Sequence, residues 1–200
     1  PCRIDILKEK VLIQIEEAKE IEKTLPNILD SFIQINNTSP TNIKYYKGKS
    51  GIKQVLWNEL QSNNEILTYS YRDLIEIVGE KFFKSWKKEF ELKGLKLRDL
   101  RSDSFLKSQT VKGYKPIPVK NDYIKYIDPN ILDIVTEIDI YNNTVVVFNW
   151  YEGEVYAVEI TNDKLTRMQK QIFNAFWKLG KAYNEEKKLK GYKVFNEENK

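Results

Sequence analysis

The first half of the chain alternates short apolar runs with amphipathic segments, and this alternation constrains the fold more than any other feature. The runs at 43–46, 65–71 and 95–101 have the length and composition of β-strands. The segments between them, 49–62 and 72–92, repeat apolar residues at helical spacing. A strand–helix–strand–helix–strand order predicts right-handed crossovers onto a parallel sheet, and therefore an α/β fold.

The second half has a different pattern. Three strand-like runs, at 132–141, 144–150 and 154–161, are separated by short turns rich in Asn and Gly. Turns this closely spaced predict an antiparallel meander, which gives this half α+β character. An amphipathic helix follows and is expected to be capped by Asn162 or Asp163. The whole domain is therefore predicted to be a mixed sheet flanked by helices.

Two further stretches have weaker patterns. The polar residues 102–119, with one glycine and two prolines, predict a mobile loop. The short run at 122–127 is interpreted as a helical turn. From residue 181 the chain is strongly charged, and we expect its end to fray.

The N-terminal segment repeats apolar residues with a period of about 3.5, which is typical of a coiled coil. Pro26 predicts a kink within it, and turn residues at 36–42 predict a hinge after it. A helix packed on its own domain is the alternative to a dimeric stem. The coiled-coil prediction assigns homodimerisation to Ile4, Leu7, Val11, Gln14, Ala18, Ile21, Leu25 and Ile28, with the one polar residue, Gln14, helping to fix register.

These patterns divide the chain into three parts. Residues 1–36 are predicted to form a coiled-coil dimerisation helix and residues 43–180 a sensor or regulatory domain. Residues 181–200 form a charged tail.

A Gly48-Lys49-Ser50 triplet resembles the end of a phosphate-binding loop. Such a loop needs a glycine five residues before the Gly-Lys pair, so that backbone N–H groups can surround the phosphates. That position is Ile43, and bulky residues follow it. The triplet is therefore interpreted as a turn between a strand and a helix.

The composition excludes several kinds of chemistry. The chain has no histidine and one cysteine, so histidine-based catalysis, imidazole metal sites and thiolate zinc clusters are absent. Carboxylate catalysis needs a pair with separated pKa values. Glu137 and Asp139 share one strand face, but the pattern favours solvated residues. We therefore predict no enzyme activity, no metal and no cofactor.

The net charge and the hydropathy of the chain limit the kinds of partner that it can have. With 33 basic and 29 acidic residues the net charge is +4, which permits an anionic partner without requiring one. No apolar run approaches the roughly 20 residues of a membrane span, and no signal peptide is visible. A soluble cytoplasmic protein with no membrane contact is expected.

A candidate ligand site follows from the predicted parallel strands, since ligands of open α/β sheets bind beyond the carboxyl ends of the strands. Arginines there could bind a carboxylate or phosphate, or they could pair with the nearby Asp73, Asp99 and Asp103. The candidate residues are Ser70, Tyr71 and Arg72 after the second strand, and Arg98, Arg101 and Ser102 at the third.

Several motifs together resemble the sensor portion of TrmB-like transcriptional regulators. They are "LPNIL" at the end of the stem, "KYYKGKSGIKQVLWNEL", "NEILTYSY", "GLKLRDLRSD", "TEIDIYNNTVVVFNW" and "KQIFNAFWKLGK", and the resemblance covers roughly residues 5–180. Each motif is soft by itself, and their order and spacing carry the likeness.

The resemblance implies a coiled-coil stem followed by a domain of phospholipase-D-like fold. The family's DNA-binding winged helix has no counterpart before Ile4, and the phospholipase D signature His-x-Lys-x4-Asp is impossible without histidine. The implied role is a non-catalytic module that senses a small or anionic effector and reaches DNA only through the missing domain. A phosphodiesterase or nuclease of the same fold, and a protein-interaction module without a small ligand, are the alternatives.

Overall fold

The computed structural model describes residues 11–12, 15–16, 19, 41–109, 117–151 and 153–190. The chain divides into two units, residues 1–40 and 41–200. None of the helices among the described residues is both long and apolar enough to cross a membrane.

In the first unit, Val11, Leu12 and Ile15 are helical and their side chains are 50%, 64% and 46% exposed. Val11 is the one described member of the predicted coiled-coil stripe. The other members lie outside the described residues, so the coiled coil remains a prediction: Ile4, Leu7, Gln14, Ala18, Ile21, Leu25 and Ile28.

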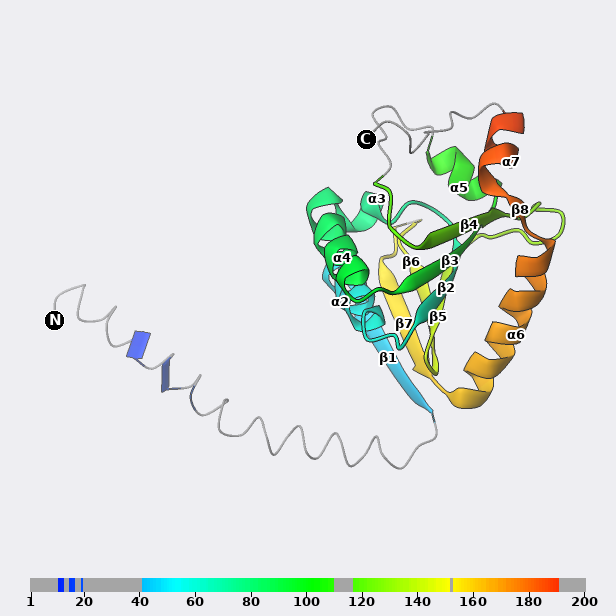
Figure 1. Ribbon diagram of the computed structural model, residues 1–200. Helices are drawn as coiled ribbons and strands as arrows, with labels where there is room; N and C mark the ends of the chain where they lie inside the picture. Colours follow the sequence, from blue (N-terminus) through cyan, green and yellow to red (C-terminus); the bar gives the residue numbers. More distant parts are fainter. Residues whose placement is uncertain are drawn as a thin grey trace. The chain divides into compact units, whose positions relative to one another are not determined.

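The second unit contains a mixed eight-stranded sheet (Figure 1). Its order is β1-β7-β6-β5-β2-β3-β4-β8, in which β2–β3 and β3–β4 are parallel and the other pairs are antiparallel. The strands are β1 (Asn42–Lys47), β2 (Glu65–Ser70), β3 (Lys96–Arg101), β4 (Asp122–Tyr126), β5 (Glu137–Tyr141), β6 (Thr144–Asn149), β7 (Tyr156–Thr161) and β8 (Lys181–Ala182).

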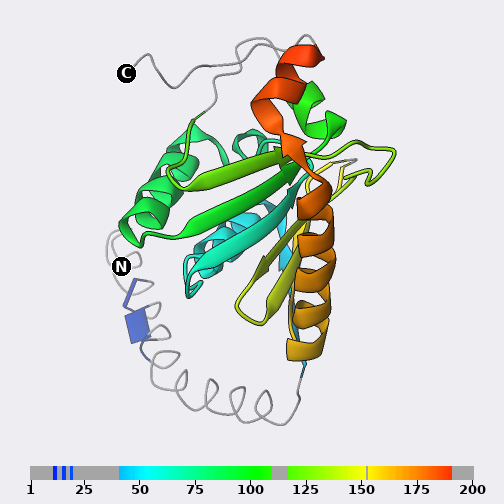
Figure 2. The same ribbon diagram turned by 45° about the vertical axis from the view of Figure 1, so that its right-hand side comes forward.

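Helices cover both faces of the sheet, with α6 on one face and α2, α3 and α4 on the other (Figure 2). Apolar side chains of α2, α3 and α4 pack together on β6 and β7, and the Trp86 indole N–H donates to the Leu56 carbonyl at 2.9 Å. On the other face Phe173 of α6 packs on Leu67 and Ile140. The helices are α2 (Gly48–Glu59), α3 (Ile75–Val78), α4 (Glu80–Leu92), α5 (Asp103–Ser108), α6 (Asp163–Leu179) and α7 (Tyr183–Leu189).

The predicted α/β fold with a mixed sheet flanked by helices is confirmed, and so is the meander of β5, β6 and β7. The predicted position of the first strand is wrong. β1 is not a parallel neighbour of β2 but lies at the edge of the sheet, antiparallel to β7. The reason lies in its composition, because a strand with Lys44 on one face and the exposed Ile43 and Tyr45 on the other suits an edge.

Four other local predictions need correction. The helix expected over 72–92 is divided at Gly79, whose φ of 79° interrupts the helical backbone. The expected helical turn at 122–127 is strand β4, since it pairs in parallel with β3. The expected loop contains α5, and the expected fraying tail forms β8 and α7 before residue 190.

One glycine is required where β1 turns into α2. A Cβ on Gly51 would lie 2.8 Å from the Tyr46 carbonyl carbon and 2.9 Å from its Cβ. Tyr46 cannot move away freely because the ladder with β7 holds its backbone.

We therefore expect Gly51→Ala to lower the free energy of unfolding by about 1–3 kcal/mol. This loss should occur although alanine favours a helix over glycine by about 1 kcal/mol. Urea denaturation measures the change, and Ser50→Ala, at an exposed position of the same turn, is the control. A Gly51→Ala protein more stable than the wild type would contradict the close approach.

Candidate functional site

The carboxyl ends of β2 and β3 bring together five of the six residues of the predicted ligand site. Ser70 and Arg101 are partners in the parallel ladder, and Tyr71, Arg72 and Ser102 follow directly. Ser70 and Ser102 are buried, so Tyr71 and Arg72 form the accessible part of this group.

The sixth residue, Arg98, does not join them. Its guanidinium donates to both carboxylate oxygens of Glu65, at 3.0 and 3.1 Å, and to Asn174 at 2.9 Å. It also lies over the rings of Phe173 and Trp177. These contacts belong to the sheet face under α6, because Arg98 precedes the strand end by three residues and so points to the opposite face from Arg101.

Arg101 is partly buried, with its side chain 13% exposed, and lies among carboxylates and aromatic rings. It pairs with Asp99, to which its Nε donates at 2.7 Å, and lies 3.6 Å from Asp122. The guanidinium sits over the rings of Phe105 and Tyr183, 4.0 and 5.1 Å from their centres. Burial by itself would lower the pKa of Arg101, but the two carboxylates raise it. Its charge is therefore neutralised within the domain.

Arg72 is the more accessible arginine at this edge. It donates to both carboxylate oxygens of Glu76, at 2.8 and 3.1 Å, and this bonding raises the pKa of Arg72. Its guanidinium lies 5.1 Å from the centre of the Tyr151 ring, and the ring of Tyr71 meets Tyr151 edge-on at 6.2 Å. One cation and two aromatic rings thus form the exposed surface at the strand ends.

Beneath this edge, five carboxyl groups lie in the interior on the sheet face that α2 covers. They are all at most 6% exposed: Glu59, Asp99, Glu137, Asp139 and Glu159. Thr68, on the central strand β2, is in register with Asp99 on one side and Asp139 on the other. The interpretation of Glu137 and Asp139 as solvated is therefore wrong, since they are 2% and 3% exposed where helices pack over their strand.

Two of these carboxyls, Glu59 on α2 and Asp139 on β5, act on each other. Burial and repulsion from Asp139 raise the pKa of Glu59 well above its usual range. Burial raises the pKa of Asp139 to about 6, although Thr68 and Glu59 oppose the rise. A neutral Glu59 that donates its proton to Asp139 fits this arrangement.

Glu137 links the interior to the exposed edge. Its Oε2 accepts the backbone N–H of Tyr71 at 2.7 Å. Burial, followed by repulsion from Asp139, raises the pKa of Glu137 well above its usual range, and the backbone N–H groups of Tyr71 and Arg72 act against that rise. The backbone of the candidate ligand site is thus held by a buried carboxyl.

Glu159 is satisfied by other partners. Asn58 of α2 donates to it at 3.0 Å, and the Tyr141 hydroxyl lies 3.4 Å away. Among the residues that the structure describes, no group of three or more acidic or Cys residues is arranged to hold a metal ion. What the described carboxyls can do chemically is hold and exchange protons.

Glu59 was not among the residues predicted from the sequence. A signal was present, because the apolar face of this helix runs through Ile52, Val55 and Leu56, and residue 59 continues it at helical spacing. A carboxylate on an otherwise apolar face indicates a buried acid with a partner.

A hollow of about 340 Å³ lies along α6 beside the β5–β6 turn and was not predicted. Its lining is polar. The Lys170 ammonium donates to the Asn142 carbonyl at 2.5 Å. The lining residues are Asn142, Asn143, Asp163, Thr166, Arg167, Lys170, Gln171 and Asn174.

No protein-family model matches the sequence, and no curated protein matches it either. Among solved structures, NucT from Helicobacter pylori is similar over 72% of this chain and 99% of its own, with a TM-score of 0.51 and 8% identity. Nuc from Salmonella typhimurium, a phospholipase D family member, has a TM-score of 0.49 and 14% identity over 72% of this chain and 98% of its own. TrmBL2, an archaeal chromatin protein, has a TM-score of 0.46 and 16% identity over 89% of this chain and 68% of its own.

At 8% identity, the likeness to NucT shows a shared fold and nothing of activity. The mixed α/β sheet flanked by helices is thus a known architecture. The carboxyl cluster and the paired arginines are features observed in this chain.

The buried carboxyls predict a pH-dependent stability. The pKa values of Glu59, Glu137 and Asp139 are raised in the folded protein, so the stabilising effect of these three groups is complete below about pH 4 and is lost as the pH rises, for Asp139 through about 6. For Asp139 alone the loss is on the order of 3 kcal/mol by pH 7 to 8. We expect Asp139→Asn to flatten this fall, measured by urea denaturation between pH 4 and pH 8.

The control is Asp133→Asn, which changes an exposed carboxyl. If Asp133→Asn and Asp139→Asn proteins lost stability with equal slopes, the pKa of Asp139 would not be raised in the folded protein.

Proposed function

We propose that residues 41–190 form the non-catalytic, effector-sensing domain of a TrmB-like transcriptional regulator. Residues 4–32 would dimerise it, and the signal would act on a DNA-binding winged helix outside these 200 residues. The order and spacing of the sequence motifs support the family. The mixed sheet with helices on both faces is consistent with it.

The observation that carries the non-catalytic role is the state of the arginines. Each arginine of the predicted ligand set is held by a carboxylate: Arg72 by Glu76, Arg98 by Glu65 and Arg101 by Asp99. A phosphodiesterase needs cationic groups ready to bind a phosphate and to stabilise its developing charge.

The accessible group of Tyr71, Arg72 and Tyr151 is the part of the edge suited to an effector. Two aromatic rings offer apolar contact, and the guanidinium can turn from Glu76 to a ligand carboxylate. Because the buried Glu137 carboxylate accepts the backbone N–H of Tyr71, an effector bound there would also affect the environment of Glu137. Regulation requires that the effector bind one arrangement of the domain better than another.

Cross-linking tests the stem. In a Cys2→Ser background, we expect Leu7→Cys to form an interchain disulfide under mild oxidation, because coiled-coil core positions of two chains face each other. Lys10→Cys, at an outward position, is the control. Non-reducing electrophoresis measures the product, and equal cross-linking at the two positions would exclude the predicted stripe.

Hydrolysis tests the non-catalytic role. Purified protein is expected to leave bis(p-nitrophenyl) phosphate uncleaved, with and without divalent metal ions. Cleavage that an Arg101→Ala protein loses while an Arg98→Ala protein keeps it would establish the phosphodiesterase alternative.

A further inference from the structure

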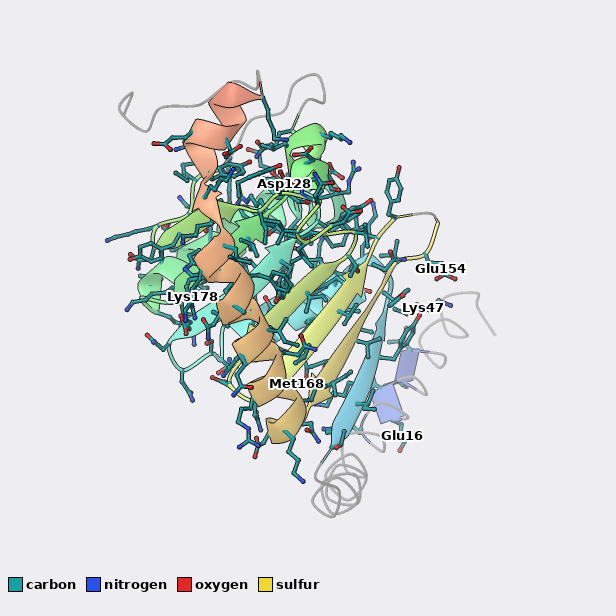
Figure 3. All side chains as sticks on the ribbon, turned by 90° about the vertical axis from the view of Figure 1, so that its right-hand side faces the viewer. Glu16, Lys47, Asp128, Glu154, Met168 and Lys178 are labelled. Atoms are coloured by element: carbon teal, nitrogen blue, oxygen red, sulfur yellow. The ribbon has the colours of Figure 1, made fainter. Side chains whose placement is uncertain are left out.

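The two faces of the sheet are covered unequally. On the face opposite α2, helix α6 packs on β5 and β6. Figure 3 looks onto this face and shows β7 and β1 beside α6. Among the described residues of the second unit, no helix other than α6 packs on this face of β5, β6, β7 and β1.

The side chains of β7 and β1 on this face are apolar or aromatic except for Lys47, which is in register with Tyr156 at one end of the two strands. Glu159 of β7 points to α2, so its neighbours Val158 and Ile160 point to the α6 side. They are in register with Tyr45 and Ile43, which are 63% and 64% exposed. The Tyr45 ring also stacks on Tyr156 of β7, with 5.7 Å between the ring centres. We call Ile43, Tyr45, Tyr156, Val158 and Ile160 the bare strip.

Helix α6 has one polar and one apolar flank. Asn174 accepts a hydrogen bond from Arg98 of β3, which places the polar flank toward β3. The apolar residues on the other flank are therefore on the side of the bare strip. Three of them are well exposed, with Ile172 at 38%, Met168 at 49% and Leu179 at 55%. The apolar flank consists of Leu165, Met168, Ile172, Ala175 and Leu179.

We propose that this face is a homodimer interface in which the apolar flank of α6 of each copy lies on the bare strip of the other. The helix flank and the strip lie side by side, so a twofold axis makes the surface complementary to itself. A helix is about 10 Å across, and strands spaced about 4.8 Å apart make a two- to three-strand strip roughly that wide. None of the ten residues carries a charge, and Lys47 lies at the end of the strip, so two copies meet without repulsion between the ten side chains.

The size of the face agrees with a dimer. The 17 residues of α6 give a length of roughly 25 Å, and the flank plus the strip is roughly 20 Å wide. Each copy would then bury about 500 Å², and the pair about 1,000 Å², the lower limit for a specific interface. A second copy would cover both the apolar flank and the bare strip, whereas a single partner helix would cover only the bare strip.

Sedimentation of the full chain carrying Leu7→Asp and Ile21→Asp tests the interface without the predicted stem. We expect this protein to remain a dimer at micromolar concentration, and Ile172→Asp to weaken the dimer at least about 100-fold, because a carboxylate would be buried among apolar groups. Asn174→Asp introduces the same charge on the polar flank and should leave the dimer intact. The proposal would be overturned if the protein carrying only Leu7→Asp and Ile21→Asp were a monomer. It would also be overturned if Ile172→Asp and Asn174→Asp weakened the dimer equally.

A second measurement does not depend on tolerance of the aspartate. In a Cys2→Ser background, copies carrying only Ile172→Cys are mixed with copies carrying only Val158→Cys and treated with a short bis-maleimide. Because each copy has one cysteine, a mixed product must join two copies. We expect that product in good yield. The control replaces the Ile172→Cys copies with Asn174→Cys copies, and an equal yield of mixed product from the two mixtures would refute the interface. Success or failure here is independent of the stem, and therefore of the proposed function.

Discussion

The structure depends on how carboxyl groups are accommodated beneath α2. Burying an ionised carboxylate without a partner costs far more than a single fold-stabilising contact provides. The protein meets this cost in three ways. The raised pKa values of Glu59 and Asp139 favour their neutral forms, Asp99 is paired with Arg101, and Glu159 accepts a hydrogen bond from Asn58. Helix α2 supplies both Glu59 and Asn58, so its position over the sheet is tied to the protonation of the acids below it.

This arrangement connects the interior with the surface where an effector is proposed to bind. Glu137 lies in the acidic layer and holds the backbone at Tyr71, whose ring faces the exposed Tyr151. A change in the charge of the layer would alter the anchoring of that edge, and a ligand at the edge would alter the pKa of Glu137 by the reciprocal effect. The opposite face has no comparable chemistry, because its described contacts are mainly apolar packing and the Arg98 network.

Local patterns predicted most elements, since periodicity and turn residues act over short distances. The runs that became β2, β6 and β7, and the helices α2 and α6, were recognised close to their observed bounds. The place of β1 was not, because its pairing with β7 depends on contacts more than 100 residues away. The ligand site was predicted in part: the strand ends bring Tyr71 and Arg101 to one edge, but alternation along β3 directs Arg98 to the other face. The positions of the buried carboxyls beneath α2 depend on which helix covers which strand. This packing cannot be predicted from any single segment of the sequence.

The edge position of β1 has a consequence for how the chain folds during synthesis. The first described strand, Asn42–Lys47, has one strand partner in the described sheet, Tyr156–Thr161, near the other end of the domain. It cannot pair until the ribosome has made nearly the whole domain, which takes on the order of ten seconds at 5–20 residues per second. Until then the strands from β2 to β4 can assemble. Helix α2 can associate with them before β1, which precedes it in the chain, has paired. Closure of the sheet by β1 is therefore a late, long-range step, and the contacts that fix α2 over the acidic layer are completed with it.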